Sequence, residues 1–363
     1  MTQKNTALLI FLLFLGTAIA YWSRGFSAAA VLLILGLGYG FVFYKARLCF
    51  ASAFYGKRDL MRAILLGLIL ASVGSAVVVA LGLNRVVMVP FGLHTLLGSA
   101  LFGFALPFAG GCMTGTLYRL GGGQSKSLAT FLGLLLGNAL GAAYMWRITE
   151  PMLDWGWRIY LPDVIGLAPA VVLNLAILGW LYWRLRGEPG HVVRLPGRAW
   201  LSAEWPAWMG GVALALLFII QFAYHSALTV QLPLARFSLW VGGLLGLPVK
   251  DLAWAQFWGL RIPALDAGFL LDVGLIFGAM IGALMMNEFA YFRAWNVRHA
   301  LVGFLGGLVM GVAVWLAIGC NVSGFWSTVA TLRFEGWLYA LGMWLGARLG
   351  LRTVNALVER DML

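Results

Sequence analysis

Residues 63–82 read AILLGLILASVGSAVVVALG, an unbroken apolar run without a charged residue. A helix over this run is long enough to cross the hydrocarbon core of a bilayer, and it satisfies its backbone hydrogen bonds internally, as lipid requires. Similar runs along the chain predict an all-α polytopic membrane protein with about ten spans. We place these spans at 6–22, 27–44, 63–82, 95–111, 127–146, 164–183, 207–225, 268–287, 299–318 and 336–351.

The composition supports a membrane protein. Of the 363 residues, 62% are hydrophobic and only 10% are charged, whereas a soluble domain carries roughly 25% charged residues. The net charge of +12 would suggest nucleic acid as the partner of a soluble protein. Here the basic residues lie in short loops between apolar runs, so we expect membrane lipid and no nucleic acid as a partner.

The basic residues also predict the orientation of the spans. With the N-terminus inside, alternate span ends carry the clusters of Lys and Arg that are typical of cytoplasmic loops. The outer loops 147–163 and 250–267 instead mix acidic with basic residues. We therefore expect a multi-pass protein of the cell (inner) membrane with both termini in the cytoplasm. The inner clusters are Lys57, Arg58 and Arg62; Arg119 and Lys126; Arg184, Arg186, Arg194 and Arg198; Arg293 and Arg298; and Arg348, Arg352 and Arg360.

Two short motifs recur on spans that run in opposite directions. Residues 46–49 read ARLC and residues 235–238 read ARFS, while 110–115 read GGCMTG and 318–324 read IGCNVSG. The sequence thus predicts two inverted pseudo-repeats, whose broken helices would place a transport site near the midplane. The expected parts are an extra N-terminal transmembrane helix (1–26), the first repeat (27–146), a linking helix with a basic cytoplasmic loop (147–204), the second repeat (205–351), in which 230–247 is re-entrant, and a cytoplasmic tail (352–363).

The three cysteines occupy related positions. Cys49, Cys112 and Cys320 each follow a predicted span at a break, and Ser238 stands at the fourth equivalent position. A lone cysteine in a membrane protein is usually an apolar filler. As a set on opposed helices, however, the three thiols and one hydroxyl predict a single path. Because thiols are weak, polarizable hydrogen-bond donors, such a path suits a soft sulfur anion.

Other polar residues near the cysteines are candidates for the same path. Thr114 and Asn321 offer further hydrogen-bond donors, and Arg47, Arg236 and Arg119 could attract an anion, although an arginine at a helix end is more often an interfacial anchor. The carboxylates Asp272, Glu288 and Glu335 lie near span ends, where we expect solvated charges and no proton relay. The four histidines are scattered without metal-ligand spacing, so we expect no metal or cofactor.

Three segments carry a resemblance to a known family: GFVFYKARLCFASAF at 40–54, AGGCMTGTLYR at 109–119 and AIGCN at 317–321. They resemble the YeeE/YedE family of membrane transporters for sulfur compounds, and the likeness extends over about 27–351. The resemblance implies thiosulfate uptake along a row of cysteines without a cofactor. Cys49, Cys112 and Cys320 match the family's functional cysteines, with Cys112 the central one. It also implies a small TusA-like sulfur-carrier protein as a partner.

Two other functions stay open at this point. A related branch of the family is linked to selenium metabolism, but it carries its halves in the other order, which favours thiosulfate here. A membrane enzyme that forms a persulfide would need a base near its reactive thiol, and no histidine is close in sequence to any cysteine. For the transporter, a negative-inside potential opposes entry of an anion by about 2.3 kcal/mol per charge per 100 mV. Coupling or consumption inside must offset this, and the sequence reveals neither.

Overall fold

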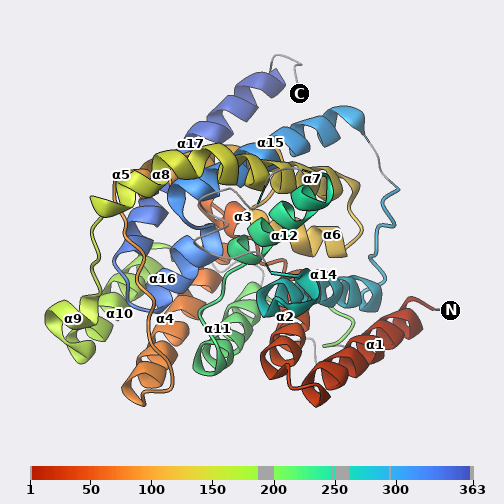
Figure 1. Cartoon of the computed structure of the whole chain (residues 1–363), viewed down its shortest axis with the longest axis horizontal. Coiled ribbons are helices and arrows are strands. Elements are labelled where there is room, and N and C mark those ends of the chain that lie inside the picture. The colour runs from red at the N-terminus through yellow and green to blue at the C-terminus, as the bar shows by residue number, and fades with distance from the viewer. Residues whose placement is uncertain (1, 187–199, 247–248, 250–260, 294–295, 360–363) are drawn as a thin grey trace.

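The computed structural model describes residues 2–186, 200–246, 249, 261–293 and 296–359. Within these ranges the chain is helical, with isolated bridges only at Phe91–Trp157 and Tyr160–Arg333 (Figure 1). Nine of the described helical segments are long and apolar enough to cross a membrane, which confirms the all-α polytopic class. They are Gln3–Ser23, Ser27–Lys45, Arg58–Ala80, Leu93–Gly121, Ser125–Asp154, Leu167–Arg184, Ala207–Tyr224, Ala267–Met285 and Val297–Ala330.

Several of these segments consist of shorter helical pieces, and short helices lie between them. The short helices α3, α12 and α16 lie toward the middle of the view in Figure 1. The elements in chain order are α1 (Gln3–Ser23), α2 (Ser27–Lys45), α3 (Phe50–Phe54), α4 (Arg58–Ala80), α5 (Leu93–Ala109), α6 (Met113–Gly121), α7 (Ser125–Leu140), η1 (Gly141–Met145), α8 (Trp146–Asp154), α9 (Leu161–Ile165), α10 (Leu167–Arg184), α11 (Ala207–Tyr224), α12 (Gln231–Leu244), η4 (Pro263–Leu265), α14 (Ala267–Met285), α15 (Val297–Ala317), η5 (Asn321–Trp326), α16 (Ser327–Ala330) and α17 (Glu335–Glu359).

Two expected segments differ in length or character from a simple span. The tenth expected span, 336–351, forms part of α17, but this helix is not among the nine because its aromatic residues and arginines make it less apolar. The segment 230–247 forms α12, whose 14 residues are too short to cross the bilayer at 1.5 Å per residue. Arg194, Arg198 and Arg360, the outer-loop residues 250–260 and the end of the tail lie outside the described residues.

Long helices from the first half of the chain pack in pairs against long helices from the second half. Helix α2 packs against α14, and α4 packs against α11; likewise α5 packs against α17, and α7 packs against α15. Helices α5 and α15 also contact each other near the centre of the arrangement. Helix α1 packs only on one side, against α2 and α14, and lies at one edge of the molecule in Figure 1.

Glycines allow these helices to approach closely. A Cβ atom added to Gly40 on α2 would lie 1.9 Å from the Leu275 carbonyl oxygen on α14, and one added to Gly346 on α17 would lie 1.9 Å from the Ala100 oxygen on α5. A real Cβ atom cannot lie this close to another atom, so only glycine fits at these positions, where the helix backbones touch. In lipid, close van der Waals packing of this kind holds helices together, because no hydrophobic effect acts between them.

We therefore expect Gly40→Ala to destabilise the protein by about 1–3 kcal/mol, because the new methyl group must push α2 away from α14. The measurement is the apparent melting temperature of the purified protein in detergent. Gly16→Ala is the matched control, since no atom lies within 4 Å of a Cβ at this position on α1. Equal melting temperatures for the two variants would contradict the close-packed geometry.

Candidate functional site

The three cysteines stand at three breaks in the helices. Cys49 follows α2 and directly precedes α3, Cys112 is the N-cap residue between α5 and α6, and Cys320 separates α15 from η5. All three are free thiols with at most 2% of their surface exposed. Each break therefore presents one buried sulfur atom at the start of a short helical segment.

The breaks share a backbone conformation. Two residues before each cysteine the chain is left-handed: Arg47 has φ 50°, Gly110 has φ 76° and Ile318 has φ 54°. Glycine adopts this region freely, but a β-branched isoleucine does so only when the surrounding structure holds it there. The same backbone geometry at all three cysteines indicates that each is positioned by an equivalent turn.

Cys49 and Cys112 lie next to each other. Their two sulfur atoms flank Gly115, where an added Cβ would lie 3.3 Å from the Cys112 Sγ and 3.7 Å from the Cys49 Sγ. The Gly115 N–H donates to the Cys112 Sγ at 3.3 Å. The first turn of α6 thus directs a backbone donor at the sulfur atom, and Gly115 leaves the space between the two thiols open.

A guanidinium group lies beside this thiol pair. Arg119 on α6 places its Nη2 3.8 Å from the Cys49 Sγ, and its Nη1 donates to the Gly110 carbonyl oxygen at the break. Among the described residues no carboxylate forms an ion pair with Arg119, whereas Arg47, Arg236 and Arg333 each have one. Its positive charge is therefore available to an anion at the thiols.

Cys320 has a different set of neighbours. The Ser323 hydroxyl donates to the Cys320 Sγ at 3.5 Å and accepts from the Cys320 N–H at 3.0 Å. The Tyr339 hydroxyl donates to the Gly319 carbonyl oxygen at 3.1 Å, which ties α17 to this break. Ser323 is not among the residues expected from the sequence, although a hydroxyl three residues after an N-cap residue can complete a capping box.

Two of the expected donors are buried without partners. Both polar atoms of the Asn321 amide and the hydroxyl of Thr114 are inaccessible to water and have no hydrogen bond to any part of the chain that the structure describes. Buried polar groups are nearly always paired, so such exceptions need an explanation. Asn321 directly follows Cys320 and Thr114 lies two residues after Cys112, so an anion bound at the breaks would accept hydrogen bonds from the Asn321 Nδ2 and the Thr114 hydroxyl.

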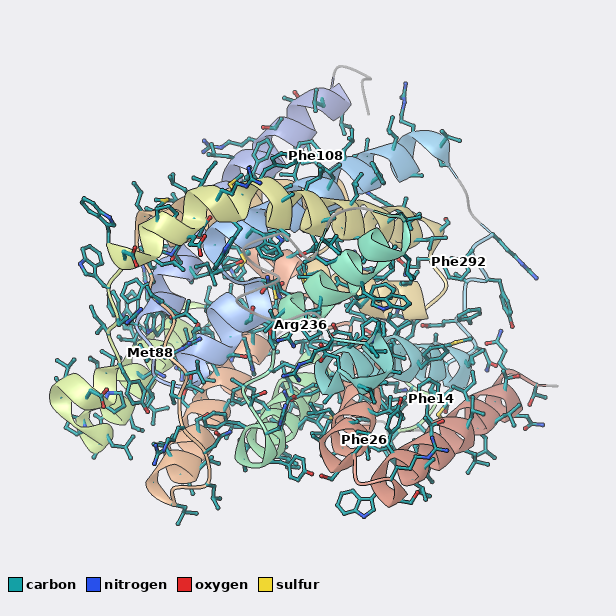
Figure 2. All side chains as sticks on the ribbon, in the orientation of Figure 1. Phe14, Phe26, Met88, Phe108, Arg236 and Phe292 are labelled. Atoms are coloured by element: carbon teal, nitrogen blue, oxygen red, sulfur yellow. The ribbon has the colours of Figure 1, made fainter. Side chains whose placement is uncertain are left out.

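The other three expected path residues have local partners. Arg47 forms ion pairs with Glu288 and Glu204 near the surface, and Arg236, labelled in Figure 2, pairs with Asp266 at 3.2 Å. The expected break at Ser238 is absent, because α12 continues through this residue and its hydroxyl donates to the Leu234 carbonyl oxygen at 2.9 Å. Hence α12 lacks the equivalent turn that the three cysteines share.

Two carboxylates expected to be solvated are buried instead. Asp272 is 2% exposed, since α14 is packed by α2, α6 and α12 at this depth, and its oxygens have no hydrogen-bond partner within the described ranges. Glu335 is 8% exposed and pairs with Arg333 at 3.0 Å. The expectation of solvated charge was wrong for both, because helices that pack on α14 cover Asp272 and because Glu335 is buried in an ion pair with Arg333.

A cavity of about 300 Å³ leads toward Cys320. It extends from the loop after α4 to Ser323, the residue that donates to the Cys320 Sγ. Arg85, Arg333 and Glu335 contribute charge to its wall. A second cavity of about 470 Å³ lies beside it, is lined by Arg236 and Arg261, and shares several residues with the first, among them His225 and Thr229. The first cavity therefore reaches Ile318 and Ser323, which lie on either side of Cys320 in the sequence.

Burial raises the pKa of the Glu335 carboxyl in this cavity wall from its ordinary value of 4.5 to about 7, and the nearby Arg333 opposes the shift. The folded protein thus binds the proton more tightly than the unfolded chain, and we expect the free energy of unfolding to fall as pH rises from about 4.5 through about 7. Melting temperatures measured across this range should show the decline in the wild type. A Glu335→Gln variant that declines just as steeply would contradict the assignment to this carboxyl.

Comparison with known proteins decides the family. A family model described as "Sulphur transport" matches residues 45–349, a range that includes all three cysteine breaks. This chain belongs to that sulphur-transport family. The expected resemblance to YeeE/YedE proteins is thereby confirmed.

Relatives within the family are named as transporters. The "Thiosulfate transporter TsuA" of Escherichia coli K12 is 25% identical over 86% of this chain and 91% of its own length. A protein of the same name from Spirochaeta thermophila is 26% identical over 86% of this chain and 96% of its own length. The "Probable transporter YedE" of Escherichia coli K12 is 31% identical over 41% of this chain. Membership confirms a multi-pass membrane transporter for sulfur compounds, and a transporter rather than an enzyme.

Proposed function

We propose that this protein imports thiosulfate through a central path on which the thiols of Cys320, Cys112 and Cys49 bind the anion in turn. One observation carries the proposal: the thiols of Cys49 and Cys112 flank Gly115, and the Arg119 guanidinium beside Cys49 has no carboxylate partner among the described residues. The full-length likeness to two proteins named as thiosulfate transporters supports the choice of anion.

The chemistry of the path suits thiosulfate. Its terminal sulfur is large and polarizable, so weak S–H donors and the Arg119 charge can replace part of its hydration shell. A hydrogen bond to a charged group is worth about 1.5–3 kcal/mol. Several such bonds, each exchanged for the next, favour passage because no single contact holds the anion too tightly to leave.

The order of the thiols follows from their neighbours. The cavity of about 300 Å³ ends at Ser323 beside Cys320, and it would open to the outside of the membrane in the expected orientation. Arg119 lies beside Cys49. Cys112 is the central thiol in this scheme because the family resemblance implies that place for it, and its Sγ lies at the same glycine, Gly115, as the Cys49 Sγ. An anion would thus enter past Cys320, pass Cys112 and leave past Cys49 toward the cytoplasm.

An inverted pair of repeats, 27–146 and 205–351, would bring the breaks together in this way. The reciprocal packing of α2 on α14 with α4 on α11, and of α5 on α17 with α7 on α15, supports such a relation. The basic clusters at alternate span ends support an inner-membrane location with cytoplasmic termini. The membrane potential opposes entry of the dianion, and a TusA-like carrier that consumes its sulfur inside would offset this cost.

Growth on thiosulfate tests the proposal. A bacterial strain without its own thiosulfate and sulfate uptake systems should grow on thiosulfate as sole sulfur source when it produces this protein, and not when it carries an empty vector. If the strain took up selenite or sulfite but did not grow on thiosulfate, the transported substrate would be another sulfur or selenium species. Stable persulfide on the purified protein without uptake would favour an enzyme.

A further inference from the structure

A third cavity, of about 530 Å³, lies between α4, α10 and α17, away from the outer cavities. Its wall is apolar and aromatic over most of its length, and several of its residues belong to the buried core. Representative members of this wall are Phe54, Leu65, Leu178, Phe325, Trp337 and Trp344. We call this cavity the α10–α17 groove.

Among the described residues, the charged side chains that line the groove are all basic. Arg58 stands at the start of α4, Arg184 at the end of α10 and Arg348 within the second half of α17, with its guanidinium 5.2 Å from the Trp344 ring centre. Three different helices thus bring a guanidinium to the same cavity, and all three side chains are exposed. In the proposed orientation these residues belong to the cytoplasmic half, where the inner leaflet has its headgroups.

Helix α10 leaves the groove open to the side. Only Ala170, Asn174 and Leu178 of this helix are buried, and among the described elements it packs mainly on α4 and α9. Figure 1 shows α9 and α10 at an edge of the molecule. In a membrane, an apolar wall at this edge would be in reach of the lipid hydrocarbon.

We propose that the α10–α17 groove binds one anionic phospholipid of the cytoplasmic leaflet. The three guanidiniums hold its phosphate, and one acyl chain lies along the apolar wall. Charge complementarity selects this occupant, because no carboxylate among the described residues lines the groove to balance the arginines. A zwitterionic headgroup would bring its own cation among them, and free phosphate would leave the apolar wall unused.

A lipid in this groove would contact the short helices that directly follow two of the cysteines. Phe54 ends α3, which starts after Cys49, and Phe325 lies in η5, which starts after Cys320. Their rings meet edge to face with centroids 5.6 Å apart, and both line the groove. The acyl chain would pack behind this pair, so the bound lipid should stabilise the protein thermally.

Native mass spectrometry of the delipidated full-length protein tests the proposal, with phosphatidylglycerol, phosphatidylcholine and inorganic phosphate as probes. We expect phosphatidylglycerol to bind and to raise the melting temperature. The triple variant Arg58→Gln/Arg184→Gln/Arg348→Gln should weaken this binding on the order of 100-fold. Lys4→Gln/Arg293→Gln/Arg298→Gln removes the same charge elsewhere on the expected cytoplasmic side and should bind as the wild type does.

A second variant keeps the charges and blocks the chain. Ala340→Trp on α17 places an indole in the groove, and it should weaken phosphatidylglycerol binding even if the triple variant does not fold. Undiminished binding in either folded variant would overturn the proposal, as would equal binding of phosphatidylcholine or inorganic phosphate. The proposal uses the membrane orientation of the proposed function, but binding is measured without thiosulfate, so failure of thiosulfate uptake would not alter this result.

Discussion

Cys112→Ala is expected to lower thiosulfate uptake at least tenfold while the protein stays folded in the membrane. The alanine removes the thiol that adjoins Cys49 and accepts from the Gly115 N–H. A transported anion would lose its central donor, and loss of one hydrogen bond to a charged group accounts for a factor of this size. Initial rates of uptake of labelled thiosulfate, corrected for protein amount, measure the effect.

Two variants separate donor chemistry from packing. Cys112→Ser keeps a donor of similar size at the same position and should retain more uptake than the alanine variant. Ser99→Ala removes a buried hydroxyl on α5 whose one hydrogen bond among the described residues is to Leu96 of the same helix, and this variant should transport normally. If Cys112→Ala were as active as Ser99→Ala, the thiols would be mere filler.

Arg119→Leu is expected to have the second largest effect, again at least tenfold on uptake. The substitution removes the positive charge beside Cys49 and the donor to the Gly110 carbonyl oxygen. Both losses disfavour a dianion at the thiol pair, the first by charge and the second by loosening the Cys112 break. Arg119→Lys keeps the charge but not the planar fork, so its uptake should lie between wild type and Arg119→Leu.

Substitution of another arginine provides the matched comparison. Arg47→Leu breaks the surface ion pairs with Glu204 and Glu288 and should change uptake far less than Arg119→Leu. A larger loss of uptake in Arg47→Leu than in Arg119→Leu would indicate that Arg47, and not Arg119, attracts the anion.

The apolar runs of the sequence predict most of the fold. Each crosses the membrane because its length and composition leave no other way to satisfy the backbone, so the expected spans recur as helices with shifts at their ends. The breaks at Cys112 and Cys320 were visible because glycines interrupt the runs there. The left-handed conformation of Ile318 was not visible, since isoleucine avoids it unless tertiary contacts impose it.

Side-chain partners from distant segments decided the rest of the site. In the sequence, Arg47 of the motif ARLC is a candidate anion ligand. In the structure it forms an ion pair with Glu288, which lies 241 positions further along the chain. Ser238 in ARFS matches Cys49 in ARLC by sequence, yet α12 continues through it without a break. Asp272 looked solvated near a span end, and only the packing of α14 against its neighbours shows that it is buried.

The most direct test of the central claim is uptake of labelled thiosulfate by proteoliposomes that contain the purified wild-type protein or the Cys112→Ala variant, with sulfate, sulfite and selenite as competitors. The thiol path predicts uptake by the wild type that unlabelled thiosulfate inhibits and excess sulfate does not, and little uptake by the variant. Equal uptake by the two proteins, or wild-type uptake that sulfate abolishes, would contradict it.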